Sequence, residues 1–182
     1  MRRRGFSFGR QAANPNIPVA LQHAHELMEG GNYAEAALAF EKLAAAAEQR
    51  MGPRAPFLFM QAGRARILLK QIPAGMAHLR HGLEMFATSG RYAHLYRAGN
   101  RAVQELKARG LEKEASEIAN LISNHIPAIS ESPTQRGPDP SRITLPTHCP
   151  SCGGPIRSDE VDWIDQFSAE CPFCGSPVRA DS

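Results

Sequence analysis

Residues 31–43 read Gly-Asn-Tyr-Ala-Glu-Ala-Ala-Leu-Ala-Phe-Glu-Lys-Leu, a glycine turn that leads into a run of strong helix formers. Segments of similar pattern occupy residues 70–82 and 110–122. Each joins two helical runs through a tight turn, so the sequence predicts three helix–turn–helix units and about six helices. The small residues that align across the three units are Ala36, Gly75 and Ala115, at separations of 39 and 40 residues.

The turns of the three units are expected at Gly30-Gly31, at Gln71-Ile72-Pro73 and at Gly110. Pro73 suits the first helical turn because its missing N–H would be unpaired there in any case. A small residue on each helix lets antiparallel neighbours approach closely, and a large one such as Phe40 fills the gap alongside. These positions indicate a mainly α architecture.

The pattern resembles the tetratricopeptide repeat over residues 18–125, most closely in the first unit. It departs from that family in its longer period, where ~34 residues is usual, and in lacking a proline at the end of each unit. The resemblance implies a helical-hairpin solenoid that binds a partner's peptide on a concave surface lined by the first helix of each unit.

Basic side chains are concentrated on the expected first helices of the second and third units. We interpret Arg64, Arg66, Arg97 and Arg101 as the lining of a basic groove for an acidic peptide or a carboxy terminus, since guanidinium groups pair with carboxylates through two hydrogen bonds. The alternative is that these are solvated charges on long helices. The sequence leaves both open.

The four cysteines form two knuckles of the pattern Cys-Pro-x-Cys-Gly, with 18 residues between Cys152 and Cys171. Two such pairs at this separation are typical of a four-cysteine zinc site. The knuckles resemble those of the zinc-ribbon family, which implies a small β module with structural Zn²⁺. Iron in a rubredoxin-like site and two redox-active pairs are the alternatives. The expected metal ligands are Cys149, Cys152, Cys171 and Cys174.

Composition divides the rest of the chain. Residues 1–17 form a basic arm with four arginines and no acid, expected to be flexible, and residues 126–147 form a linker with five prolines. The zinc ribbon, residues 148–182, has two arginines against six acids, a formal charge of −4. The sequence leaves open whether this ribbon swings free or folds back on the last helix. No stretch is apolar enough to span a membrane, and cysteines kept for a metal fit a cytoplasmic, reducing compartment.

Aromatic residues offer a second contact surface on the ribbon. Trp163 is expected in the ribbon core and Phe173, at a knuckle tip, is expected to be exposed for a partner. His78 and His81 lie on one helix face with no neighbouring carboxylate in the sequence, so we interpret them as packing or surface residues.

These features together favour a non-catalytic adaptor that binds proteins and carries a structural zinc ribbon. A nucleic-acid-associated protein, using the basic arm, the basic helices and the ribbon, is the alternative function. An enzyme is not expected, because the sequence has no phosphate-binding glycine loop, no catalytic metal motif and no nucleophile elbow.

Overall fold

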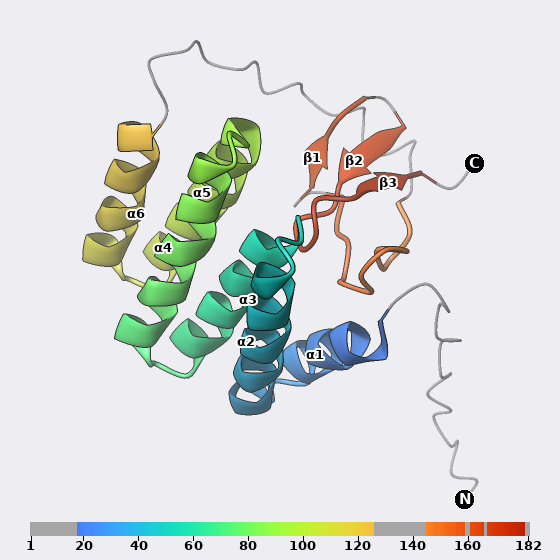
Figure 1. The fold of residues 1–182 in the computed structure, drawn as a ribbon, viewed down its shortest axis with the longest axis horizontal. Coiled ribbons are helices and arrows are strands. Elements are labelled where there is room, and N and C mark those ends of the chain that lie inside the picture. Colours follow the sequence, from blue (N-terminus) through green and yellow to red (C-terminus); the bar gives the residue numbers. More distant parts are fainter. Residues whose placement is uncertain (1–17, 126–144, 159–160, 166, 181–182) are drawn as a thin grey trace, which may run out of the picture.

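The computed structural model describes residues 18–125, 145–158, 161–165 and 167–180. The described chain is mainly helical, with six helices followed by a small antiparallel sheet (Figure 1), which confirms the expected fold class. The basic arm and most of the predicted linker lie outside these residues. The helices are α1 (Val19–Glu29), α2 (Tyr33–Gln49), α3 (Ala55–Leu68), α4 (Ile72–Thr88), α5 (Tyr92–Ala108) and α6 (Glu112–His125).

The five turns between the helices share one backbone feature. Each contains a residue in the left-handed region, which ends one helix and lets the chain reverse into the next. The first and third predicted turns, at residues 30–32 and 109–111, lie where the sequence places them. The second lies at residues 69–71, two residues before the predicted position, because Ile72 and Pro73 already form the first turn of α4. The left-handed residues recur about every 20 positions: Gly31, Met51, Lys70, Gly90 and Gly110, with φ of 77°, 51°, 61°, 69° and 73°.

Helix α3 is the central element of the array, buried on nearly all sides between α2 and α4. It approaches α4 through two glycines, and a Cβ on Gly63 would lie 2.8 Å from the backbone oxygen of Gly75. Ala36 and Ala115, aligned with Gly75 in the sequence, are also fully buried. The small residues of the repeat therefore allow the close approach of helices that the sequence pattern predicts.

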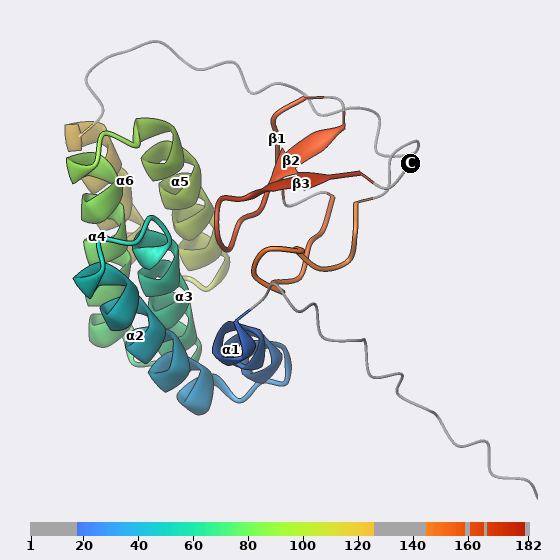
Figure 2. The same ribbon diagram turned by 45° about the vertical axis from the view of Figure 1, so that its right-hand side comes forward.

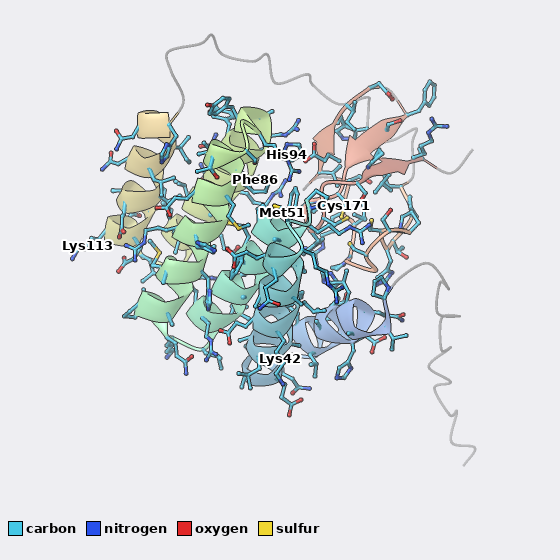
Figure 3. The ribbon with its side chains drawn as sticks, in the orientation of Figure 1. Lys42, Met51, Phe86, His94, Lys113 and Cys171 are labelled. Carbon is cyan, nitrogen blue, oxygen red and sulfur yellow. The ribbon has the colours of Figure 1, made fainter. Side chains whose placement is uncertain are left out.

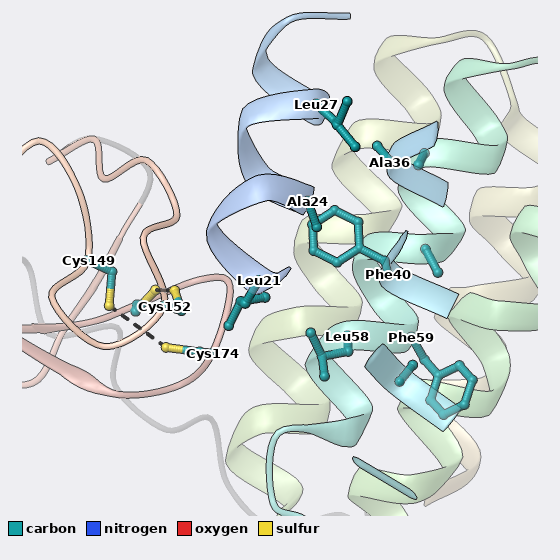
Figure 4. Close-up of a cluster of buried hydrophobic side chains, with 14 of the residues drawn as sticks. Leu21, Ala24, Leu27, Ala36, Phe40, Leu58, Phe59, Cys149, Cys152 and Cys174 are labelled. Atoms are coloured by element: carbon teal, nitrogen blue, oxygen red, sulfur yellow. Dashed lines mark hydrogen bonds between the residues drawn. The ribbon is translucent and has the colours of Figure 1, made fainter. Parts of the chain in front are cut away.

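Two apolar cores fill the described molecule, and α3 contributes to both. One lies among α3, α4, α5 and α6, around Leu83 and Phe86. The other combines α1, α2 and α3 with the cysteine-bearing segment (Figure 4), so Phe40 and Cys152 belong to one contiguous cluster. No described helix is long and apolar enough to cross a membrane.

Residues 145–158, 161–165 and 167–180, which we call the cysteine module, carry a three-stranded antiparallel sheet in the order β1-β2-β3. The strands are β1 (Asp162–Trp163), β2 (Ser168–Glu170) and β3 (Pro177–Arg179). Trp163 pairs with Ala169, and Ala169 pairs in turn with Val178. Ala169 and Val178 are buried, whereas Trp163, expected in the module core, is only half-buried.

The cysteine module lies against the odd-numbered helices, as two views of the ribbon show (Figures 1 and 2). Its side chains contact α1, α3 and α5, while α6 lies at the opposite end of the array. The idea that the module folds back on the last helix is therefore wrong. The reason is tertiary: its complementary charge and apolar surface are on α1, α3 and α5.

Candidate metal centre and its interface with the helices

The two cysteine knuckles have the same backbone geometry. In each, the N–H of the glycine after the second cysteine bonds to the carbonyl of the first: Gly153 to Cys149 at 2.8 Å and Gly175 to Cys171 at 2.9 Å. Both glycines have φ near +70°, at 75° and 70°. The requirement for glycine after Cys-Pro-x-Cys follows, because an L side chain rarely adopts this backbone conformation.

Backbone N–H groups point at the sulfur atoms, as expected for knuckles that hold a metal. Ser151 N–H lies 3.4 Å from Cys149 Sγ, and Phe173 N–H lies 3.4 Å from Cys171 Sγ. These bonds stabilise negative charge on sulfur and set the direction of each side chain. The knuckles are therefore built to accept negative charge on sulfur, as metal binding requires.

The four sulfur atoms converge on one point. They all lie within 4.8 Å of one another, and all four cysteines are buried. The separation of Cys149 Sγ from Cys174 Sγ is 3.8 Å, and that of Cys152 Sγ from Cys171 Sγ is 3.7 Å (Figure 4). A tetrahedron with metal–sulfur bonds of about 2.3 Å has edges of about 3.8 Å. The cluster thus has the size of a four-thiolate metal site, and the distances are far too long for disulfides.

Hydrogen bonds among the four cysteines shift their pKa values in opposite directions. The pKa of Cys174 and that of Cys149 lie below the ordinary thiol value, because neighbouring cysteine thiols hydrogen-bond to their sulfurs. The pKa of Cys152 and that of Cys171 are raised, first by the hydrogen bond that each shares with Cys149. Four thiolates cannot ionise together in this buried volume unless a metal ion neutralises them.

The cysteine module shares its core with the first two helices. Leu21 of α1 lies between the cysteines and Leu58 of α3 (Figure 4), and all belong to one buried cluster. His25 of α1 is 3% exposed and stands edge-on to two rings, Phe40 and Phe173, each at 5.2 Å between centroids. Burial lowers the pKa of His25 to about 4, so this ring is a neutral packing group between α2 and the second knuckle.

A second contact joins the module to α3. Gly175 of the second knuckle lies directly against the Phe57 ring, since a Cβ at this glycine would stand 2.5 Å from Phe57 Cζ. Phe57 is itself held edge-on to Phe86, at 4.9 Å, with the Arg91 guanidinium 5.4 Å from its centroid. The glycine that the knuckle requires for its backbone is therefore also required for docking.

A charged contact joins the module to α5. Glu170 of β2, whose side chain is 12% exposed, accepts a hydrogen bond from Arg97 Nη2 at 2.6 Å and lies 3.3 Å from His94 Nε2. A carboxylate at that distance alone would raise the pKa of His94. Burial and the charges of Arg91 and Arg97 outweigh it and lower that pKa to about 4. His94 lies on the module side of α5 (Figure 3).

The arginines predicted to line a groove are largely engaged within the chain. Arg64 donates to Glu105 at 2.8 Å, and Arg66 donates through two nitrogens to Glu41 at 2.7 and 2.8 Å. Arg97 pairs with Glu170, as described above. Arg64 and Arg101 both line a cavity between α3 and α5. The four residues therefore do not form one continuous basic surface: Arg66 faces α2, Arg97 faces the module, and Arg64 and Arg101 face the cavity.

Two expectations about aromatic and histidine residues are corrected. Phe173 is half-buried against His25, and the exposed aromatic of the described module is Phe167, at 65%. His78 and His81 do have carboxylates beside them, because α2 places Glu41 and Glu48 2.9 and 2.7 Å from their Nε2 atoms. These carboxylates are more than 30 residues distant in sequence, so local spacing could not reveal them.

Sequence reasoning also missed the residues that dock the module. Glu170, His94 and Phe57 carried no motif, and their roles depend on pairing across the interface. One signal was available: an acid directly before a candidate metal ligand, in a chain whose expected first helices carry several arginines. Comparison with known proteins finds no family model, no curated protein and no solved structure that matches this chain.

Proposed function

We propose that the protein is a non-catalytic adaptor: a tetratricopeptide-like helical array that binds a partner protein, with a structural Zn²⁺ in its cysteine module. The observation that carries the proposal is the recurrence of the helical pair, with a left-handed turn about every 20 residues and a buried small residue at Ala36, Gly75 and Ala115. Repeated helical pairs generate extended surfaces suited to protein recognition.

The chemistry of the cysteine cluster supports a structural metal. Four buried cysteine sulfurs are enough to fill a tetrahedral shell, which would leave no position for a water or a substrate. Thiolate ligands at this spacing suit Zn²⁺, and their reduced state suits a cytoplasmic compartment. Metal content measured on the purified chain tests this: one Zn²⁺ per chain is expected. A visible absorption band from thiolate-bound iron would instead identify the bound metal as iron.

Binding of nucleic acid is the competing function. The pairing of Arg64, Arg66 and Arg97 with acids of the same chain reduces the positive charge that these helices offer to phosphates.

Direct binding separates the two functions. Partners captured by the full zinc-loaded chain are purified and tested by calorimetry, and random-sequence DNA and RNA are tested beside them at several salt concentrations. A stoichiometric, weakly salt-dependent complex with a protein is the expected result. Binding of nucleic acid alone, with a steep salt dependence, would refute the adaptor proposal.

A further inference from the structure

A cavity of about 510 Å³ lies beside the docked cysteine module, between α3 and α5. Its floor is apolar, with Met60, Ile67 and Leu79 among its lining residues, and its rim is charged. Cavities of roughly 300–1,000 Å³ are the size range of specific ligand sites. The volume therefore suits one or two large side chains of a bound peptide.

The rim of the cavity has an excess of positive charge. Arg64, Arg101 and Arg109 line it together with a single acid, Glu105, a formal balance of +2. Glu105 Oε1 accepts a hydrogen bond from Arg64 at 2.8 Å and another from Arg109 at 2.8 Å, so one carboxylate is shared by two guanidinium groups. Both arginines are partly exposed, at 40% and 33% of their side chains. A guanidinium has five N–H donors, so this rim retains donors for a further carboxylate.

The side-chain oxygen of a buried amide in the cavity wall lacks a partner within the described part of the chain. Gln61 of α3 is 7% exposed, lines the cavity, and its Oε1 has no hydrogen-bond partner among the described residues. Leaving such an acceptor unpaired costs about 1–3 kcal/mol. A ligand that donates a hydrogen bond to this oxygen would remove that cost.

The cysteine module supplies the remaining wall of the cavity. Pro172 and Phe173, the two residues between the ligands of the second knuckle, both line it. Their position depends on the cysteine cluster, because the Phe173 N–H bonds to Cys171 Sγ at 3.4 Å. On its other side Phe173 packs on Gly154 of the first knuckle, where a Cβ would stand 2.7 Å from its ring. The knuckles thus hold each other and the cavity wall in place.

We propose that this cavity is a metal-dependent peptide site, completed by the second cysteine knuckle. Its occupant is a segment of a partner protein that inserts a large apolar side chain and places a neighbouring carboxylate on the arginines. A backbone N–H of that segment donates to Gln61. The proposal rests on the adaptor function and adds to it the location of the site, the chemistry of the partner, and the requirement for the metal.

The test is selection of random peptides displayed on phage against the full zinc-loaded chain. An enriched peptide is then synthesised with a fluorescent label and titrated against the wild type, Q61M, F173A and K42A. Gln61→Met keeps the side-chain volume and removes the unpaired amide. Lys42→Ala is the matched control, because it removes an exposed positive charge on α2, away from the cavity (Figure 3). Metal content and helical circular dichroism are measured for every variant.

Enriched peptides are expected to combine a large apolar residue with a nearby Asp or Glu. Their binding should weaken about tenfold in Q61M and in F173A, the loss expected for one good hydrogen bond or packing contact, and remain unchanged in K42A. Chelation should abolish it. Since Q61M removes an unpaired buried amide, its fold should be at least as stable as the wild type, so that weaker binding reports the site itself.

Two results would overturn the proposal in distinguishable ways. If the peptides bind F173A, Q61M and the chelated chain as tightly as the wild type, the cavity is not the binding site, but the adaptor function still stands. If selection enriches no peptide at all, both the cavity site and the adaptor function are refuted. Where chelation also reduces helical content, the comparison of zinc-loaded Q61M with K42A decides.

Discussion

Replacing Glu170 by Gln tests whether the cysteine module is held against the helices by its charged contact. The substitution keeps the shape of the side chain and removes the charge that faces Arg97 and His94. Removing one partner of a fully buried pair costs about 3–5 kcal/mol, and exposed pairs contribute about 0.2–1 kcal/mol. Glu170 is 12% exposed but Arg97 is 31% exposed, so solvent screens part of the interaction. We expect a loss of about 1–2 kcal/mol.

The single tryptophan of the chain, Trp163, makes the assay specific, because it reports on the module while circular dichroism reports on the helices. Urea unfolding of the zinc-loaded chain is followed by both signals, in urea rather than guanidinium so that the ion pair is not screened. With a slope of about 1–3 kcal/mol per molar urea, the tryptophan midpoint of E170Q should fall by about 1 M. Glu84→Gln, which removes an exposed carboxylate from α4, is the control.

A double-mutant cycle with Arg97→Met isolates the pair, and its coupling energy should be about 1 kcal/mol. Coupling near zero, with the E170Q midpoint equal to that of E84Q, would refute the reasoning. The module would then be held by apolar contacts alone.

The remaining predictions concern turns, packing, pH and metal. Lys70→Gly should stabilise the chain by about 1 kcal/mol in thermal unfolding, because Lys70 has φ of 61°; an unchanged midpoint would contradict this. Gly75→Ala should destabilise it by about 1–3 kcal/mol despite its better helix propensity, because the new Cβ would lie 2.6 Å from Ile67 Cγ1, and a gain in urea resistance would be the contrary result. The pKa of His94 is about 4 when folded and 6.5 when unfolded, so stability present above pH 6.5 should be lost as the pH falls toward 4. The wild type should therefore lose more stability than His94→Gln in that interval, and parallel curves would argue against a buried neutral ring. Chelation should reduce the hydrogen-exchange protection of the α1 amides and leave that of the α6 amides unchanged, since only α1 shares its core with the cysteines. Equal loss of protection in both helices would show that the chain unfolds as a single cooperative unit.

Local chemistry made most of the helical array predictable. The turns at Gly31 and Gly110 need a left-handed residue, which glycine supplies at no steric cost, and Pro73 marks the start of α4. Lys70 in the equivalent turn shows the limit of this reasoning, because the tertiary packing of α3 on α4 imposes a left-handed conformation that lysine does not favour. The spacing of residues along one helix determines these features, so one sequence suffices to find them.

The cysteine cluster was predictable for the same reason. A Cys-Pro-x-Cys-Gly knuckle closes on itself through bonds such as Gly175 N–H to the Cys171 carbonyl, within five residues of chain. Two knuckles that each present two sulfurs have one way to satisfy a tetrahedral metal. The sequence by itself therefore determined the helices, their turns and the four candidate ligands.

Only the tertiary structure decided where the module lies and which surface remains open. The pairing of Arg97 with Glu170 spans 73 residues, and the contact of Gly175 with Phe57 spans the same interface. Such contacts leave no periodic trace, because any arginine may meet any acid once the chain is folded. The arginines expected to form one basic groove are thus divided: Arg97 faces the cysteine module, Arg66 pairs with Glu41 of α2, and Arg64 and Arg101 line a cavity that the second knuckle completes. The arginines are separated in this way because the packing of distant elements decides which acid each one meets, and local sequence spacing does not encode that packing.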